Sequence, residues 1–123
     1  MIKLDRESKQ IKVDTRLVVV FLMCLGLALA ALSANAVAST KSITLNDDFF
    51  SPGTLTIAKN DKIKFVWNET SHRHNVTVKS GPRSFHSSTK RSGTYTKKFT
   101  TRGTYKIHCT IHSDKMKLTV KVK

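Results

Sequence analysis

The part of the chain that follows Ala38 is patterned for β-strands and not for helices. In seven short segments, apolar residues alternate with polar ones, and Thr, Val, Ile and aromatic residues are frequent. A period of two residues is typical of strands that bury one face. The seven segments are 43–45, 55–58, 63–67, 74–79, 95–99, 105–109 and 116–122.

Turn-forming residues separate these segments. Gly, Pro, Asn, Asp and Ser cluster at 51–53, 59–61, 80–82, 91–93 and 101–103. Short alternating strands at this spacing predict an all-β sandwich. The segment 81–93 is the longest stretch without a clear pattern, and no internal repeat is visible.

The N-terminal part of the chain is predicted to be a signal peptide. Residues 17–34 are almost all apolar, basic residues precede them, and the small-residue pattern Ala36-Val37-Ala38 follows. We expect cleavage after Ala38, with Ala36 as the second choice. The alternative is a retained membrane anchor, because 18 apolar residues are just enough to span a bilayer. Either way, residues 1–38 form the targeting segment, and the domain 39–123 is expected in the periplasm or on the extracellular face of the membrane.

The segment 39–123 is strongly basic. It has 17 Lys and Arg against five Asp and Glu, a formal charge of +12. Most of the basic residues fall at positions expected to face solvent, so the charge could simply be a solvated surface. It could also steer the protein toward an acidic partner or an anionic envelope surface. Export and the absence of a recognised motif argue against a nucleic-acid partner.

One cysteine, one methionine and five histidines remain in this segment. Cys109 is the last residue of its predicted strand and has the same parity as Tyr105 and Ile107, which are expected to face the core. His74 and Met116 are each the first core-facing residue of their predicted strands. If neighbouring strands run antiparallel, these three side chains meet at one end of the sandwich. His112 lies in the intervening loop 110–115 and would join them.

This set of donors predicts a copper site. Thiolate and thioether groups select soft metals, and two His with one Cys and a weak axial Met describe a blue-copper electron-transfer centre. The expected ligands of one copper ion are therefore His74, Cys109 and His112, with Met116 in the axial position. Two alternatives remain open: Cys109 as a buried structural thiol, and Met116 as ordinary core.

The other histidines are expected to lie outside the site. His72 shares the parity of His74 and is its competitor, but we place it in a loop at the rim. His108 has outward parity and should face solvent. His86 lies in the segment 81–93 and receives no role.

Two stretches resemble the small cupredoxins of the plastocyanin type: GTYKIHCTIHSDKM at 103–116 and HNVTV at 74–78. The resemblance covers nearly all of 39–123, although the three residues between His112 and Met116 depart from the usual family spacing. It implies a Greek-key β-sandwich. It also implies that Asn75 tethers the two ligand-bearing loops and that the exposed edge of His112 passes the electron.

We therefore expect an exported, monomeric type 1 copper protein that carries one electron between redox partners, with an acidic surface on the partner. No catalytic base or substrate pocket is evident, so an enzyme is not expected. Three alternatives stay open: a copper-delivery protein of the cell envelope without redox turnover, zinc at the same site, and a metal-free interaction module.

Overall fold

A computed structural model of the chain describes residues 34–123, and the predicted signal segment lies for the most part outside the described residues. Residues 37–123 pack as one compact unit. Within the described part, no helix is long and apolar enough to cross a membrane. Its strands are β1 (Thr40–Asn46), β2 (Phe49–Ser51), β3 (Thr54–Ile57), β4 (Lys62–Trp67), β5 (Thr77–Ser80), β6 (Gly93–Lys98), β7 (Gly103–His108) and β8 (Lys117–Val122).

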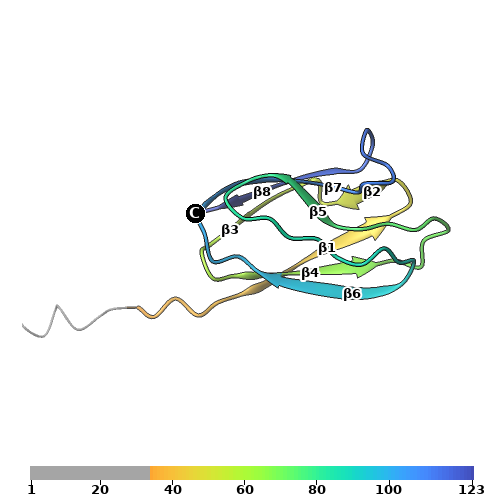
Figure 1. Cartoon of the computed structure of the whole chain (residues 1–123). Coiled ribbons are helices and arrows are strands. Elements are labelled where there is room, and N and C mark those ends of the chain that lie inside the picture. The colour runs from red at the N-terminus through yellow and green to blue at the C-terminus, as the bar shows by residue number, and fades with distance from the viewer. Residues whose placement is uncertain (1–33) are drawn as a thin grey trace, which may run out of the picture. The chain divides into compact units, whose positions relative to one another are not determined.

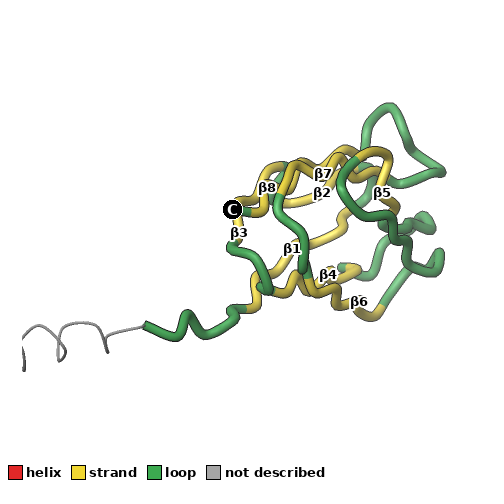
Figure 2. The backbone as a smooth tube through the Cα atoms, turned by 60° about the vertical axis from the view of Figure 1, so that its left-hand side comes forward, coloured by secondary structure: helices red, strands yellow, loops and turns green. Residues whose placement is uncertain are grey.

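The strands form two mixed sheets that face each other (Figure 2). One sheet has the order β2-β1-β4-β6, and the other has the order β3-β8-β7-β5. The pairs β1–β4 and β3–β8 are parallel, and the other pairs are antiparallel. The predicted all-β sandwich is confirmed.

Two details of the strand prediction differ from the structure. Strand β2 is an additional strand, whose three residues are too few to show an alternating pattern. Strand β5 begins at Thr77 and not at His74. His74 instead forms an isolated bridge with Lys90, so the first residues of the predicted strand pair with a loop rather than with a sheet.

The alternating residues form the core between the sheets. Their burial follows the predicted parity, as in β4, where Ile63, Phe65 and Trp67 are buried, and in β7, where Tyr105 and Ile107 are buried. Each such side chain contributes about 1.5–3 kcal/mol to folding through the apolar surface that it removes from water.

Three connections gather at one end of the sandwich (Figure 1). They are the β1–β2 turn, the β4–β5 connection and the β7–β8 loop. The β4–β5 connection carries the predicted ligand His74, and the β7–β8 loop carries Cys109, His112 and Met116. The strand pairing therefore decides where the site forms.

Candidate metal centre

Three of the four predicted ligands meet at this end of the molecule. The Nδ1 atoms of His74 and His112 lie 3.2 Å apart, and the Cys109 Sγ lies 3.9 Å from the His112 Nδ1. One donor atom from each of the three residues falls within 4.8 Å of the others. The side chains that the β4–β5 connection and the β7–β8 loop contribute therefore lie close together at one point.

The donors fit a single first-row metal ion. Imidazole nitrogen and thiolate sulfur bind zinc at about 2.0–2.3 Å, and similar lengths for copper would place two ligands of one ion at most about 4.5 Å apart. The distances of 3.2 Å and 3.9 Å lie inside this limit. Cys109 is a free, buried thiol, so its sulfur is available to a metal.

The β7–β8 hairpin holds Cys109 and Met116 side by side. These strands pair antiparallel up to His108 and Lys117, and the Cys109 N–H donates to the Met116 carbonyl over 3.2 Å. The Met116 N–H donates to the His112 carbonyl over 2.9 Å, which closes the loop. Met116 is fully buried. Its backbone is thus adjacent to Cys109, and its role as the axial ligand stays a prediction.

His74 is fixed by its backbone as well as by its burial. Its N–H and carbonyl both bond to Lys90, each over 3.0 Å, and the Trp67 indole N–H donates to the same carbonyl over 3.0 Å. The residue is fully buried. Its imidazole therefore reaches the site from a segment that is held by Lys90 and by Trp67 of β4.

Asn75 links the two ligand-bearing segments, as the family resemblance implied. Its side-chain oxygen accepts the Thr110 N–H over 3.0 Å, and its amide NH₂ donates to the Thr110 hydroxyl over 2.7 Å. The same amide also bonds to the hydroxyls of Thr77 and Thr89. The residue next to His74 thus holds the residue that follows Cys109.

Asp47 orients His74 from the opposite side of the ring. Its carboxylate Oδ1 lies 3.3 Å from the His74 Nε2. The Ser71 hydroxyl and N–H, at 2.5 Å and 3.1 Å, hold the pKa of the Asp47 carboxyl well below its usual range, against the effect of desolvation. An anionic Asp47 favours a proton on Nε2, which leaves Nδ1 free to bind a metal. A carboxylate on the outer nitrogen is a common feature of metal-binding histidines.

Sequence analysis did not single out Asp47 or its neighbour Asp48. Both lie in the β1–β2 turn, where acidic residues are common without any further role. Asp48 has a left-handed backbone with φ of 68°, and its Oδ1 lies 3.6 Å from the Nε2 of His112. The two turn carboxylates therefore face the outer nitrogens of both predicted histidine ligands.

Two of the remaining histidines are exposed, and one is not. His72 lies at the rim, with a side chain that is 61% exposed, and His86 is exposed in the 81–93 segment. His108 has the predicted outward parity, but it is not fully exposed to solvent. His108 pairs with Thr77 and Lys117 on its two flanking strands and is half-buried, with a buried Nδ1.

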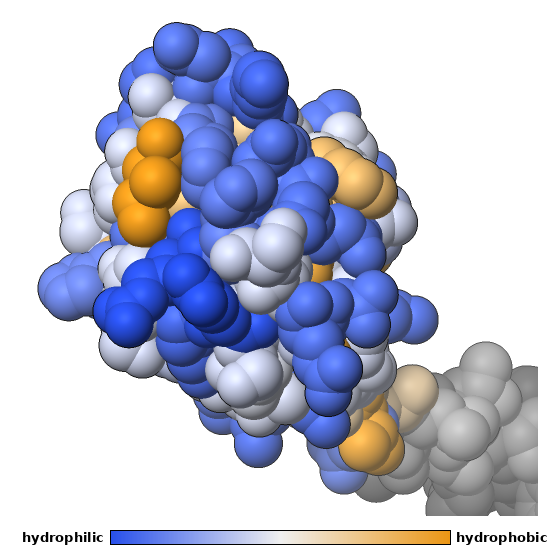
Figure 3. Space-filling model, turned by 90° about the vertical axis from the view of Figure 1, so that its right-hand side faces the viewer, coloured by the Kyte–Doolittle hydropathy of each residue, from blue (hydrophilic) through white to orange (hydrophobic). Residues whose placement is uncertain are grey.

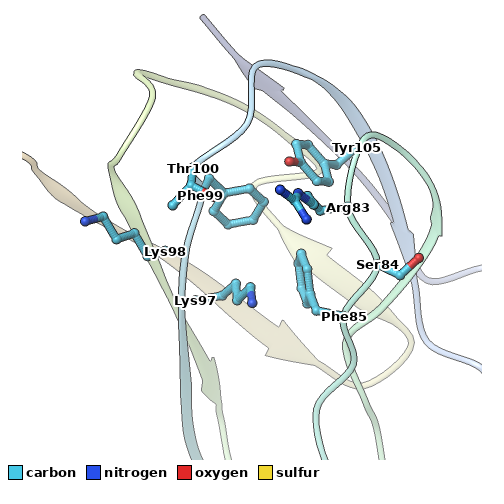
Figure 4. A pocket seen from close by; sticks show the side chains of 8 residues that line it. All are labelled: Arg83, Ser84, Phe85, Lys97, Lys98, Phe99, Thr100 and Tyr105. Atoms are coloured by element: carbon cyan, nitrogen blue, oxygen red, sulfur yellow. The ribbon is translucent and has the colours of Figure 1, made fainter.

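A separate cavity of about 370 Å³ opens beside the first half of β7 (Figure 4). Aromatic rings and basic side chains line it, and the Phe99 ring packs edge-on against both Phe85 and Tyr105. None of the four predicted metal ligands lines this cavity. A molecule bound there would therefore not contact the metal donors.

Comparisons with known proteins agree with this architecture. The family model of the cupredoxin-like domain matches residues 17–120. No curated protein matches the chain. A copper-containing nitrite reductase from Thermus scotoductus SA-01 superposes with a TM-score of 0.59 at 28% identity, over 78% of this chain but only 26% of that chain.

Variants of amicyanin superpose over most of their length. An oxidized variant has a TM-score of 0.58 at 24% identity and covers 76% of this chain and 88% of its own. The Cu(I) form of another has a TM-score of 0.60 at 22% identity and covers 73% and 88%. At these identities the superpositions show the fold. Because the family model matches residues 17–120 of the 123 residues, the chain belongs to the cupredoxin-like domain family.

Proposed function

We propose that the protein is an exported one-electron carrier that holds one copper ion through His74, Cys109 and His112, with Met116 as the weak axial ligand. The observation that carries this proposal is the convergence of one thiol and two imidazoles within 4.8 Å at one end of a cupredoxin fold. The copper-containing nitrite reductase and the Cu(I) amicyanin among the similar structures support copper as the metal.

Copper in such a site supplies one-electron chemistry between Cu(II) and Cu(I). The protein must therefore hold the donor atoms in nearly the same positions for Cu(II) and for Cu(I). The clamp on His74, the Asn75 link and the hairpin at Cys109 and Met116 all restrict movement of the donors. A rigid donor set reduces the reorganisation that accompanies electron transfer.

His112 is the expected route for the electron. The His112 side chain is 23% exposed, whereas Cys109, His74 and Met116 are fully buried. The surface at this end is mostly hydrophilic, with a few apolar patches (Figure 3). Ile111, which precedes His112, is 54% exposed and would contribute an apolar contact to a docked partner.

The formal charge of +12 on residues 39–123 supports a redox partner with an acidic contact surface. Long-range attraction between opposite charges raises the association rate of such pairs and weakens with added salt. We propose that the protein acts as a monomer at the periplasmic or extracellular side, as a carrier and not as an enzyme.

Copper delivery without redox turnover is the second candidate. The exposed His72 side chain, close to the His112 ring at a centroid distance of 5.8 Å, favours it because it could receive copper from outside. A carrier retains its ion through repeated oxidation and reduction. A delivery protein releases its ion to an acceptor.

The first test is the absorption spectrum of the purified protein with Cu(II), combined with elemental analysis. A Cu(II)–thiolate bond is expected to give an intense blue colour that Cys109→Ser and His112→Ala both abolish. His86→Ala is the matched control and should stay blue, because His86 lies outside the donor set. Zinc in the purified protein, or a colour unchanged in Cys109→Ser, would contradict the proposal.

A further inference from the structure

A second group of metal-binding side chains lies on the outer side of His112. Asp48, His72 and His112 each offer one donor atom, and these atoms fall within 4.8 Å of one another. Asp48 and His72 come from the β1–β2 turn and the β4–β5 connection, and both are accessible at the surface. The group shares only His112 with the inner donor set.

The hydrogen-bond partners indicate which nitrogens are available in this group. Asp47 favours a proton on the His74 Nε2, so the His74 Nδ1 is an acceptor. The Nδ1 atoms of His74 and His112 lie 3.2 Å apart and both face the inner donor set. The His112 Nε2 is the ring nitrogen on the outer side, and it lies 3.6 Å from the Asp48 Oδ1.

The carboxylate of Asp48 has an oxygen that lacks a hydrogen-bond donor. Its Oδ1 is buried and has no hydrogen-bond partner among the described residues, and it lies 3.6 Å from the His112 Nε2. A buried carboxylate oxygen without a hydrogen-bond donor is a place where a proton, a water or a cation can bind. The nearby nitrogen of His72 adds a third donor to metal at the same point.

We propose that Asp48, His72 and the Nε2 atom of His112 form a surface site that captures Cu(II) before it reaches the inner donors. The inference rests on the proposed copper function and adds the route by which the ion is acquired. Two imidazoles and one carboxylate suit Cu(II), whereas the inner thiolate and thioether also suit Cu(I). The two turn carboxylates also place negative charge at this point of an otherwise basic domain, where only five acidic residues occur in 39–123.

His112 connects the two sites through its two nitrogens. Transfer inward requires the His112 Nδ1 to lose its proton and the Cys109 thiol to lose its own, because both atoms bind metal in their deprotonated form. The Nε2 atom takes up one proton as it releases the ion, and then donates to Asp48. One proton therefore goes to solvent for each ion transferred, and no electron moves in this step.

The test measures how fast the copper-free protein acquires Cu(II). The protein is mixed with limiting Cu(II) in a stopped-flow instrument, and the growth of the blue colour is recorded. His72→Ala is expected to slow loading of the protein with copper by about tenfold, which is the size of the loss in metal affinity or activity when a residue bonded to a metal ligand is removed. Its final spectrum and reduction potential should equal those of the unmodified protein.

Two further variants complete the test. Asp48→Asn removes the carboxylate but introduces a residue that also tolerates the left-handed backbone at this position. This variant is expected to slow loading in the same way as His72→Ala. His86→Ala removes an exposed histidine elsewhere and should load at the unmodified rate.

The possible results separate this inference from the proposed function. Loading of His72→Ala or Asp48→Asn at the rate of His86→Ala would overturn the capture site and leave the carrier function intact. A changed final spectrum in His72→Ala would also overturn it, because His72 would then belong to the inner site. Failure of the unmodified protein to turn blue would instead refute the proposed function.

Discussion

The Asp47 Oδ1 lies 3.3 Å from the Nε2 of His74, so a turn 27 residues earlier in the chain fixes the ring of a predicted metal ligand. The same carboxylate accepts the N–H groups of Ser71 and His72. The contact thus couples the β1–β2 turn to the segment that leads into His74. It also favours a proton on Nε2, which leaves the His74 Nδ1 that faces His112 free to bind a metal.

Asp47→Asn is expected to raise the reduction potential and to lower copper affinity by about tenfold. The amide keeps an acceptor for Ser71, but it removes a negative charge that stabilises the more positive, oxidised ion. Voltammetry and copper competition titrations measure the two effects. Asp114→Asn, an exposed change in the β7–β8 loop, is the control for charge alone. Equal shifts in the two variants would show that the contact with His74 has no specific effect.

Asn75→Ala is expected to destabilise the copper-free protein by about 3 kcal/mol. The substitution removes four hydrogen bonds at a buried position and leaves the Thr110 N–H without its partner. Urea denaturation measures the loss. Asn68→Ala is the matched control, because Asn68 is exposed and its side chain bonds only to the Asn46 side chain among the described residues. A loss as small as that of the control would contradict the structural role of Asn75.

Met116→Leu tests the axial assignment. The two side chains have similar volumes, so the fold should lose less than about 1.5 kcal/mol. The protein should keep its copper and its blue colour, and its reduction potential should rise because the oxidised ion loses a weak donor. An unchanged potential would identify Met116 as ordinary core, and complete loss of copper would contradict a weak axial role.

Asp61 would bind the new N-terminus that the predicted cleavage after Ala38 creates. The buried carboxylate of Asp61 accepts the N–H groups of Ser39 and Ala58 over 2.8 Å and 2.9 Å. These two bonds lower the pKa of the Asp61 carboxyl, and the bond from Ser39 has the larger effect. Cleavage after Ala38 would turn the Ser39 nitrogen into an α-ammonium group beside this carboxylate. A protein that begins at Ser39 should then melt a few degrees higher than one that begins at Ala38.

The pH dependence follows from the direction of this pKa shift. Because the folded pKa is lowered, the contribution of Asp61 is fully present above the unfolded pKa of about 3.9 and is lost as the pH falls through the folded value. Asp61→Asn should remove both this dependence and the difference between the two N-termini. Equal melting temperatures for the two proteins at neutral pH would argue against an ion pair at Ser39.

Strand parity was enough to predict much of the site. Cys109 and Met116 lie on alternating rows whose inward faces could be identified from the sequence, and the β7–β8 hairpin brings them together as expected. His74 lies close to Cys109 and His112 as expected, but its position depends on a bridge to Lys90 that no local pattern reveals.

The acidic residues and His108 show where the sequence was insufficient. Asp47 and Asp48 look like ordinary turn residues until the fold places them beside His74 and His112. His108 has outward parity, yet it is half-buried, and its Nδ1 is buried without a hydrogen-bond partner among the described residues. Contacts between residues far apart in the chain decided both outcomes.

Voltammetry of the purified protein with its copper content determined in parallel tests the central claim most directly. The account predicts one copper per chain and a reversible one-electron wave that disappears in Cys109→Ser. A protein that retains no copper, or that holds copper without a reversible wave, would contradict it.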